Sequence, residues 1–138
     1  MTTTITAPVV SALTAGVLIM LQMLLMLRTA LTRRSQGVSL GAGEGYLLRR
    51  SRRHGNLAEN AAIFIACFAI VEMLGEPRLW MEIACGLFLF ARLLHIVGLS
   101  QKEKTANIFR VAGVILTFAI GIGLGIRLLH LAAPLVFR

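Results

Sequence analysis

Charged and amide side chains recur at helical spacing in the middle of the chain. One set, at i, i+3, i+7 and i+10, consists of Arg49, Arg52, Asn56 and Glu59. Such residues share one stripe of an α-helix. A second pair, Arg92 and His95, is spaced i, i+3 in another apolar stretch. Because guanidinium groups bind carboxylate and phosphate in a bidentate manner, these patterns predict a site for an anionic small molecule or an anionic lipid headgroup.

Two members of these sets have opposite charges at similar depth. Glu59 follows Arg53 by six residues and Arg92 precedes Leu99 by seven, so a rise of about 1.5 Å per residue places both roughly 10 Å below the membrane surface. An arginine at the centre of a membrane helix costs about 2.5 to 3.5 kcal/mol. We therefore expect a Glu59–Arg92 ion pair, which either fixes the helix register or faces a ligand.

A second charged group is expected near the opposite membrane face. Glu72 and Glu82 lie there at matching depth, and Arg127 is expected to reach them in a structural cluster. Glycines in the last apolar segment indicate close approach of its backbone to neighbouring helices. They are Gly113, Gly121, Gly123 and Gly125. No metal site is predicted, because the histidines lack a second carboxylate–histidine set.

Four apolar segments must position these residues. The chain is 57% hydrophobic over 138 residues, more than a soluble domain of this size covers with polar surface. A membrane helix needs about 20 mostly apolar residues, and the Gly75-Glu76-Pro77 run ends the second segment because proline cannot continue a helix. We predict one domain, residues 1–138, folded as an all-α integral membrane four-helix bundle. Its expected helices span about 8–32, 45–74, 79–99 and 107–131.

The distribution of the net charge of +8 predicts the orientation. Basic residues flank the apolar segments, and the aromatic residues needed to stack bases are not interleaved with them, so nucleic-acid binding is not predicted. Loops rich in Lys and Arg stay in the cytoplasm. The basic residues of the first and third loops and of their flanks are Arg28, Arg33, Arg34, Arg49, Arg50, Arg52, Arg53, Lys102, Lys104 and Arg110. The second loop has only Arg78, so both termini are expected outside and the first and third loops in the cytoplasm.

The motif Arg49-x-x-Arg52-x-His54-x-Asn56-x-x-Glu59 resembles the signature of the MAPEG family, the membrane-associated proteins in eicosanoid and glutathione metabolism. The Arg92-x-x-His95 pair and Arg110, which opens the fourth helix, also resemble that family. The resemblance covers roughly residues 8–131. The stretch from residue 54 to residue 99 looks most like the bacterial inner-membrane branch.

The resemblance implies a homotrimer in the bacterial inner membrane that binds glutathione between subunits near the cytoplasmic face. Arg52, Asn56 and Glu59 would hold the tripeptide, and Arg49 and His54 would flank it. Arg92 would complete the site across the helix pair, with His95 in the same set. Arg110 would lie near the sulfur and favour the thiolate, as a nearby cation does. The thiolate would then attack a lipophilic small molecule arriving from the membrane lipids, or reduce a lipid hydroperoxide.

The chain departs from the family pattern at three positions. Leu99 stands where many members carry tyrosine, Val111 where some carry a hydroxyl residue, and Leu48 where an acidic residue often precedes the first arginine. Loss of a hydroxyl donor near the sulfur lowers a rate by on the order of 10²-fold or more. Glutathione binding is therefore expected, and turnover stays open.

Two other functions are compatible with the sequence. One is a non-catalytic membrane scaffold whose arginines bind anionic lipid or another anion. The other is a small transporter or channel subunit, against which the lack of inverted repeats and broken helices counts.

Overall fold

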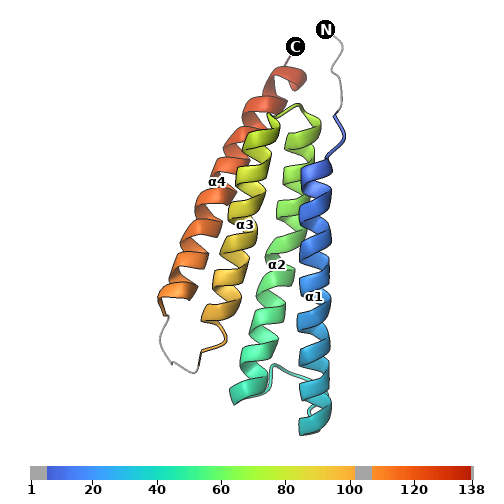
Figure 1. Ribbon diagram of the computed structural model, residues 1–138, viewed down its shortest axis with the longest axis vertical. Coiled ribbons are helices and arrows are strands. Elements are labelled where there is room, and N and C mark those ends of the chain that lie inside the picture. The colour runs from blue at the N-terminus through green and yellow to red at the C-terminus, as the bar shows by residue number, and fades with distance from the viewer. Residues whose placement is uncertain (1–5, 102–106, 138) are drawn as a thin grey trace.

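The computed structural model describes residues 6–101 and 107–137. Its four helices are α1 (Val9–Gln36), α2 (Gly45–Met73), α3 (Arg78–Gly98) and α4 (Ile108–Val136) (Figure 1). No strand occurs in the described ranges, so the all-α prediction is confirmed. Lys102 and Lys104, used above to predict the orientation, lie outside the described residues.

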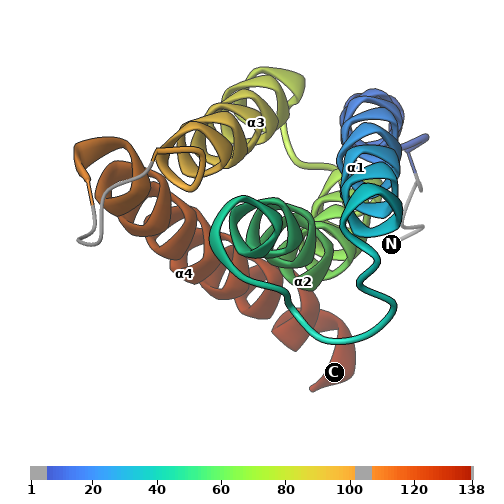
Figure 2. The same ribbon diagram turned by 90° about the horizontal axis from the view of Figure 1, so that it is seen from below.

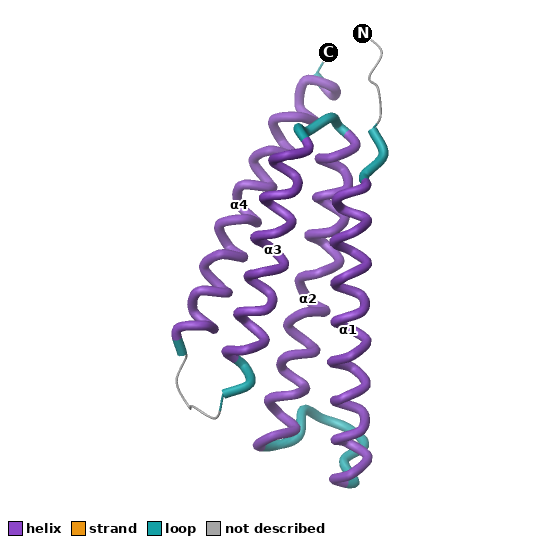
Figure 3. The backbone as a smooth tube through the Cα atoms, viewed as in Figure 1, coloured by secondary structure: helices purple, strands orange, loops and turns teal. Residues whose placement is uncertain are grey.

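All four helices are long and apolar enough to cross a membrane. The described ends of the chain and the α2–α3 loop lie at one end of the bundle, which we call the terminal end (Figure 1). The α1–α2 loop (residues 37–44) and the α3–α4 connection lie at the other end, which we call the basic end. The α1–α2 loop at the basic end and the α2–α3 loop at the terminal end are both short (Figure 3). The predicted arrangement, in which both termini share one side of a membrane, requires this layout.

Local signals set the helix ends. α1 continues to Gln36 rather than ending near residue 32, and it stops at Gly37, whose φ of 66° is left-handed. The N–H of Gly37 donates to the carbonyl of Arg34, and that of Val38 donates to the carbonyl of Arg33, which is the pattern of a glycine C-cap. At the start of α4 the side chain of Asn107 accepts from the N–H of Arg110 at 3.0 Å and caps the helix.

The four helices pack around a shared aromatic core. α1 and α4 each pack on α2 and α3, and they lie on opposite sides of that pair (Figure 2). The rings of Phe64 and Phe88 stack with their centroids 4.3 Å apart, and Phe68 meets Phe88 edge-on at 5.8 Å. Phe68 and Phe88 are fully buried. This core holds α2 against α3 at mid-height.

Two of the four α4 glycines allow close packing within the chain. A Cβ on Gly113 would lie 2.9 Å from the carbonyl oxygen of Ala91 in α3, and one on Gly121 would lie 3.1 Å from the ring of Phe64. Gly123 and Gly125 have nothing within 4 Å at that position. The prediction of close approach therefore holds for the first two glycines and is wrong for the other two within this chain.

The charged group at the terminal end differs from the expectation. Arg127 pairs with Glu76, with Nε to Oε2 at 2.6 Å, and Glu82 pairs with Arg78 one turn earlier in α3 at 2.8 Å. Glu72 is buried, and its carboxylate accepts from the first turn of α1: from Val10 N–H at 2.9 Å, Ser11 N–H at 2.8 Å and Ser11 Oγ at 2.6 Å. Glu72 faces α1 rather than α4, so the predicted reach of Arg127 to Glu72 or Glu82 is wrong.

Candidate functional site

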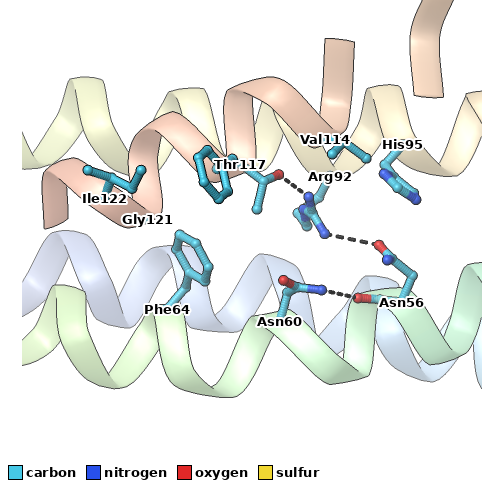
Figure 4. Close-up of a pocket in the computed structure, with 10 residues that line it drawn as sticks. Asn56, Asn60, Phe64, Arg92, His95, Val114, Thr117, Gly121 and Ile122 are labelled. Atoms are coloured by element: carbon cyan, nitrogen blue, oxygen red, sulfur yellow. Dashed lines mark hydrogen bonds between the residues drawn. The ribbon is translucent and has the colours of Figure 1, made fainter. Parts of the chain in front are cut away.

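A cavity of about 430 Å³ opens between α2, α3 and α4. Its polar lining comes from predicted site residues on α2 and α3, namely Asn56, Arg92 and His95, and from Asn60 and Thr117. Its apolar lining consists of Phe64, Val114, Phe118, Gly121 and Ile122. The polar side chains lie toward the basic end and the aromatic ones lie deeper (Figure 4). The cavity therefore offers a polar part and an apolar part to one ligand.

Arg92 is the centre of the polar part. Only 2% of its surface is exposed. Its Nη1 donates to Oδ1 of Asn56 at 3.0 Å, and its Nη2 donates to Oγ1 of Thr117 (Figure 4). The hydroxyl of Thr117 in turn donates to the carbonyl of Gly113 at 2.7 Å. The guanidinium is thus held between α2 and α4 by neutral groups, and it forms no ion pair with a described residue.

Two buried nitrogen atoms at the cavity have no partner. They are Nε of Arg92 and Nδ1 of His95, neither of which forms a hydrogen bond among the described residues. His95 is 6% exposed. Buried polar atoms are usually satisfied, and each exception calls for an explanation. Both atoms belong to residues that line the cavity, although the two nitrogen atoms themselves are buried.

The expected Glu59–Arg92 ion pair does not form within the chain. Arg92 takes Asn56 and Thr117 as partners, while Glu59 is exposed. Asn56 and Asn60 occupy the α2 face that lines the cavity, and Glu59 is turned about 60° around the helix axis from Asn56. Arg52 is also exposed. The predicted stripe therefore divides into an inward part, with Asn56, and an outward part, with Arg52 and Glu59.

The remaining predicted residues lie around the cavity without lining it. Arg49 is half-buried, with its guanidinium 5.8 Å from the ring centre of Tyr46. His54 is half-buried and lies about 200° around α2 from Asn56, on the opposite side from the cavity. Arg110 is exposed at the start of α4. It shares a helical face with Val114 and Thr117, which follow it by four and seven residues, so it lies between the cavity and the basic end.

Thr117 was not predicted as a site residue. It is the one hydroxyl-bearing residue in α4. A lone threonine within an apolar stretch of a membrane helix is the signal that could have identified it, because such hydroxyls often bond across helices. Asn60 lies one turn after Asn56 and donates to its carbonyl at 2.9 Å; the spacing used for the stripe does not include it.

Among the described residues, the basic end carries cations without carboxylate partners. The ion pairs among the described residues are Arg127–Glu76 and Arg78–Glu82, both at the terminal end. At the basic end, Arg50 instead donates to the carbonyl of Arg28 at 2.7 Å and to the hydroxyl of Thr32 at 2.9 Å. Arg53 donates to the hydroxyl of Ser100 at 3.0 Å. Within the described part of the chain these charges have only neutral partners, which favours binding of an anion nearby.

The amino-acid sequence matches one protein-family model. The model described as the MAPEG family matches residues 11–130, which include most of all four helices and every residue of the cavity. No curated protein matches the chain.

Proposed function

Because the chain belongs to the MAPEG family, we propose that this integral membrane protein binds glutathione in the cavity between α2, α3 and α4. The observation that carries the proposal is Arg92, a buried guanidinium that lines the cavity and whose only hydrogen-bond partners among the described residues are the neutral side chains of Asn56 and Thr117. A buried cation of this kind is costly unless it is paired. A carboxylate of glutathione would supply the missing negative charge.

The polar lining matches the other groups of a tripeptide. Asn56 accepts from Arg92 through Oδ1, which leaves its Nδ2 hydrogens to donate to a ligand carbonyl. His95 Nδ1 is a further unsatisfied atom at the same wall. Arg49 supports the positive potential from the basic end, whereas His54, on the far side of α2, would act only as a neighbour of the site.

Arg52 and Glu59 support a site shared between subunits. Both are exposed on α2, a candidate membrane span; Arg52 lies near the start of α2 at the basic end, whereas Glu59 lies about 10 Å further along the helix. Charged residues inside membrane segments almost always face protein or a water-filled cavity. In the proposed homotrimer this α2 face meets a neighbouring copy, and Arg52 and Glu59 bind the part of the glutathione that extends from the cavity to that interface.

The proposed chemistry uses Arg110. A cation near a thiol lowers its pKa and increases the thiolate fraction, and Arg110 shares the α4 face that leads into the cavity. In conjugation, the thiolate sulfur forms a bond to an electrophilic carbon while the leaving group departs with its electron pair. In peroxide reduction, two glutathione thiols are oxidised to one disulfide while a lipid hydroperoxide becomes an alcohol and water. The apolar part of the cavity would hold the lipophilic substrate.

A non-catalytic anion-binding scaffold is the second candidate. It is favoured by the exposed arginines of α1 at the basic end, Arg28 and Arg34, which are remote from the cavity lining. Anionic lipid headgroups would bind such residues without any thiol chemistry.

Glutathione titration of the purified protein in detergent tests the proposal. Heat release reports binding, and ultraviolet absorbance of the thiolate reports activation. We expect saturable binding that Arg92→Gln abolishes, and a thiolate signal that Arg110→Ala reduces. Arg78→Ala is the matched control, because it removes an exposed arginine at the terminal end. Absence of binding at millimolar glutathione in folded protein would refute the proposal, and binding without thiolate would favour a carrier over an enzyme.

A further inference from the structure

A second cavity, of about 370 Å³, lies at the terminal end between α2, α3 and α4. It shares no lining residue with the first cavity. Its floor is made by residues of the buried core, among them Phe68, Val71 and Met81, each at most 2% exposed. Ala84, Leu87 and Leu124 form its walls. An apolar cavity of this kind suits a hydrocarbon chain.

Charged and aromatic groups surround the mouth of this cavity. Glu76, Arg127 and Trp80 all line it, and Glu76 belongs to the α2–α3 loop, at the level where the helices leave the membrane. Trp80 is 62% exposed. Tryptophan at this level is typical of the headgroup region of a membrane, where its ring is partly apolar and partly wet.

Arg127 has hydrogen-bond donors available at the mouth. Its Nε donates to Glu76 at 2.6 Å, and its side chain is 40% exposed. A guanidinium has five N–H donors, and the bond to Glu76 is the only one that Arg127 forms among the described residues. Glu76 therefore fixes the orientation of the guanidinium, while the four Nη hydrogens can bind a phosphate in a bidentate manner.

We propose that this cavity binds one phospholipid molecule of the adjacent leaflet, with its phosphate on Arg127 and the upper part of one acyl chain between α3 and α4. The dimensions agree with this assignment. From Trp80 to Leu87 and from Arg127 to Ile120 the cavity spans seven residues on each helix, or about 10 Å at 1.5 Å per residue. A phospholipid places its phosphate at the mouth, beside Trp80 and Arg127, and its first methylenes in the interior, toward Leu87 and Ile120.

A phospholipid explains the mouth and the interior together. An apolar helix of a second copy could fill the interior, but it would bring no anion to the free donors of Arg127. A soluble anion could bind Arg127, but it would leave the apolar interior unfilled. One molecule with a phosphate and a hydrocarbon chain satisfies both.

Gly123 offers a direct way to fill the cavity. It lines the cavity wall, and a Cβ at this position meets nothing within 4 Å, so Gly123→Leu can extend into the space that the acyl chain would occupy. Gly125 has equally open surroundings but does not line the cavity. Gly125→Leu is therefore a matched control on the same helix.

Trp80 provides the signal, because it is the only tryptophan of the chain. The full-length protein in detergent is titrated with phosphatidylethanolamine brominated in the upper half of its acyl chains, which quenches tryptophan fluorescence on contact. We expect quenching that saturates at low lipid fraction, in addition to a linear component from random contact. Gly123→Leu should lose the saturable component, and Gly125→Leu should keep it. Arg127→Gln should raise the half-saturating fraction by about tenfold, as expected for loss of one charge-assisted hydrogen bond.

Three results would overturn the assignment. Linear quenching alone, in the unmodified protein and all variants, would show that no site exists. Equal saturation by brominated diacylglycerol, which has no phosphate, would remove the role of Arg127. Absence of saturable quenching together with a change of oligomeric state in Gly123→Leu would mean that a second copy fills the cavity. The diacylglycerol comparison uses the unmodified protein, so the test does not depend on the folding of any variant.

Discussion

The hydroxyl of Thr117 allows the role of Arg92 to be tested with a single methyl-for-hydroxyl exchange. Thr117 accepts from Arg92 Nη2 and donates to the carbonyl of Gly113, and it is 9% exposed. Thr117→Val has nearly the same shape and removes both bonds. Arg92 then keeps only its bond to Asn56, so its guanidinium is free to turn away from the cavity.

The expected magnitudes differ for stability and for binding. A hydrogen bond to a charged group contributes about 1.5 to 3 kcal/mol to stability, and this bond exists without ligand, so the free energy of unfolding should fall by about that amount. The affinity for glutathione should fall only because binding must then order the Arg92 side chain, which the bond to Thr117 holds in place in the unmodified protein. That ordering costs about 0.5 to 1.5 kcal/mol, which at 1.4 kcal/mol per factor of ten predicts roughly 2- to 12-fold weaker glutathione binding.

Calorimetric titration with glutathione and thermal unfolding would measure the two effects on the same samples. Thr117→Ser keeps the hydroxyl and should bind nearly as the unmodified protein does. Thr14→Val is the control for removing a buried hydroxyl, because Thr14 donates to the carbonyl of Val10 within α1 at 2.8 Å, far from the cavity. If Thr117→Val binds glutathione with unchanged affinity, or Thr14→Val weakens binding equally, the positioning of Arg92 by Thr117 is refuted.

Three further predictions concern packing and assembly. Glu72→Gln should lower the free energy of unfolding by about 2 kcal/mol, because it weakens charge-assisted bonds to the start of α1. Glu82→Gln, in an exposed pair, should change it by less than about 1 kcal/mol. Chemical unfolding measures both, and equal losses would contradict the bonding of Glu72 to α1. Gly113→Ala should destabilise the protein by about 1 to 3 kcal/mol, because its Cβ would lie 2.9 Å from the α3 backbone. Gly123→Ala, in open space, should not destabilise it. Equal shifts of the thermal unfolding midpoint in the two variants would argue against tight α3–α4 packing. Glu59→Gln should weaken both glutathione binding and the proposed trimer without loss of helicity, as followed by titration, light scattering and circular dichroism; an unchanged trimer with unchanged binding would place Glu59 outside the site.

The sequence was sufficient to predict the helices and the family. Runs of apolar residues and the break at Gly75-Glu76-Pro77 are local signals, and they predicted four helices where the structure has four. The spacing of Arg49, Arg52, Asn56 and Glu59 is likewise local, and it identified the family that matches residues 11–130. Within one helix, spacing alone determines which residues share a face.

Partners across helices could not be predicted in this way. Depth and charge favoured Glu59 for Arg92, yet Arg92 meets Asn56 and Thr117. The same reasoning favoured Glu72 or Glu82 for Arg127, which instead pairs with Glu76. Depth fixes the height of a residue in the membrane, but a pair also needs both side chains to point at each other.

That direction depends on how each helix is rotated about its axis, and rotation is set by packing between segments far apart in the sequence. The close approach at Gly113 draws α4 against α3 and brings Thr117 beside Arg92. The stacked rings of Phe64 and Phe88 hold α2 so that Asn56 faces inward and Glu59 faces outward. The sequence by itself therefore determined the helices, their polar faces and the family, whereas the tertiary structure decided which polar groups meet, because only packing sets the rotation of each helix.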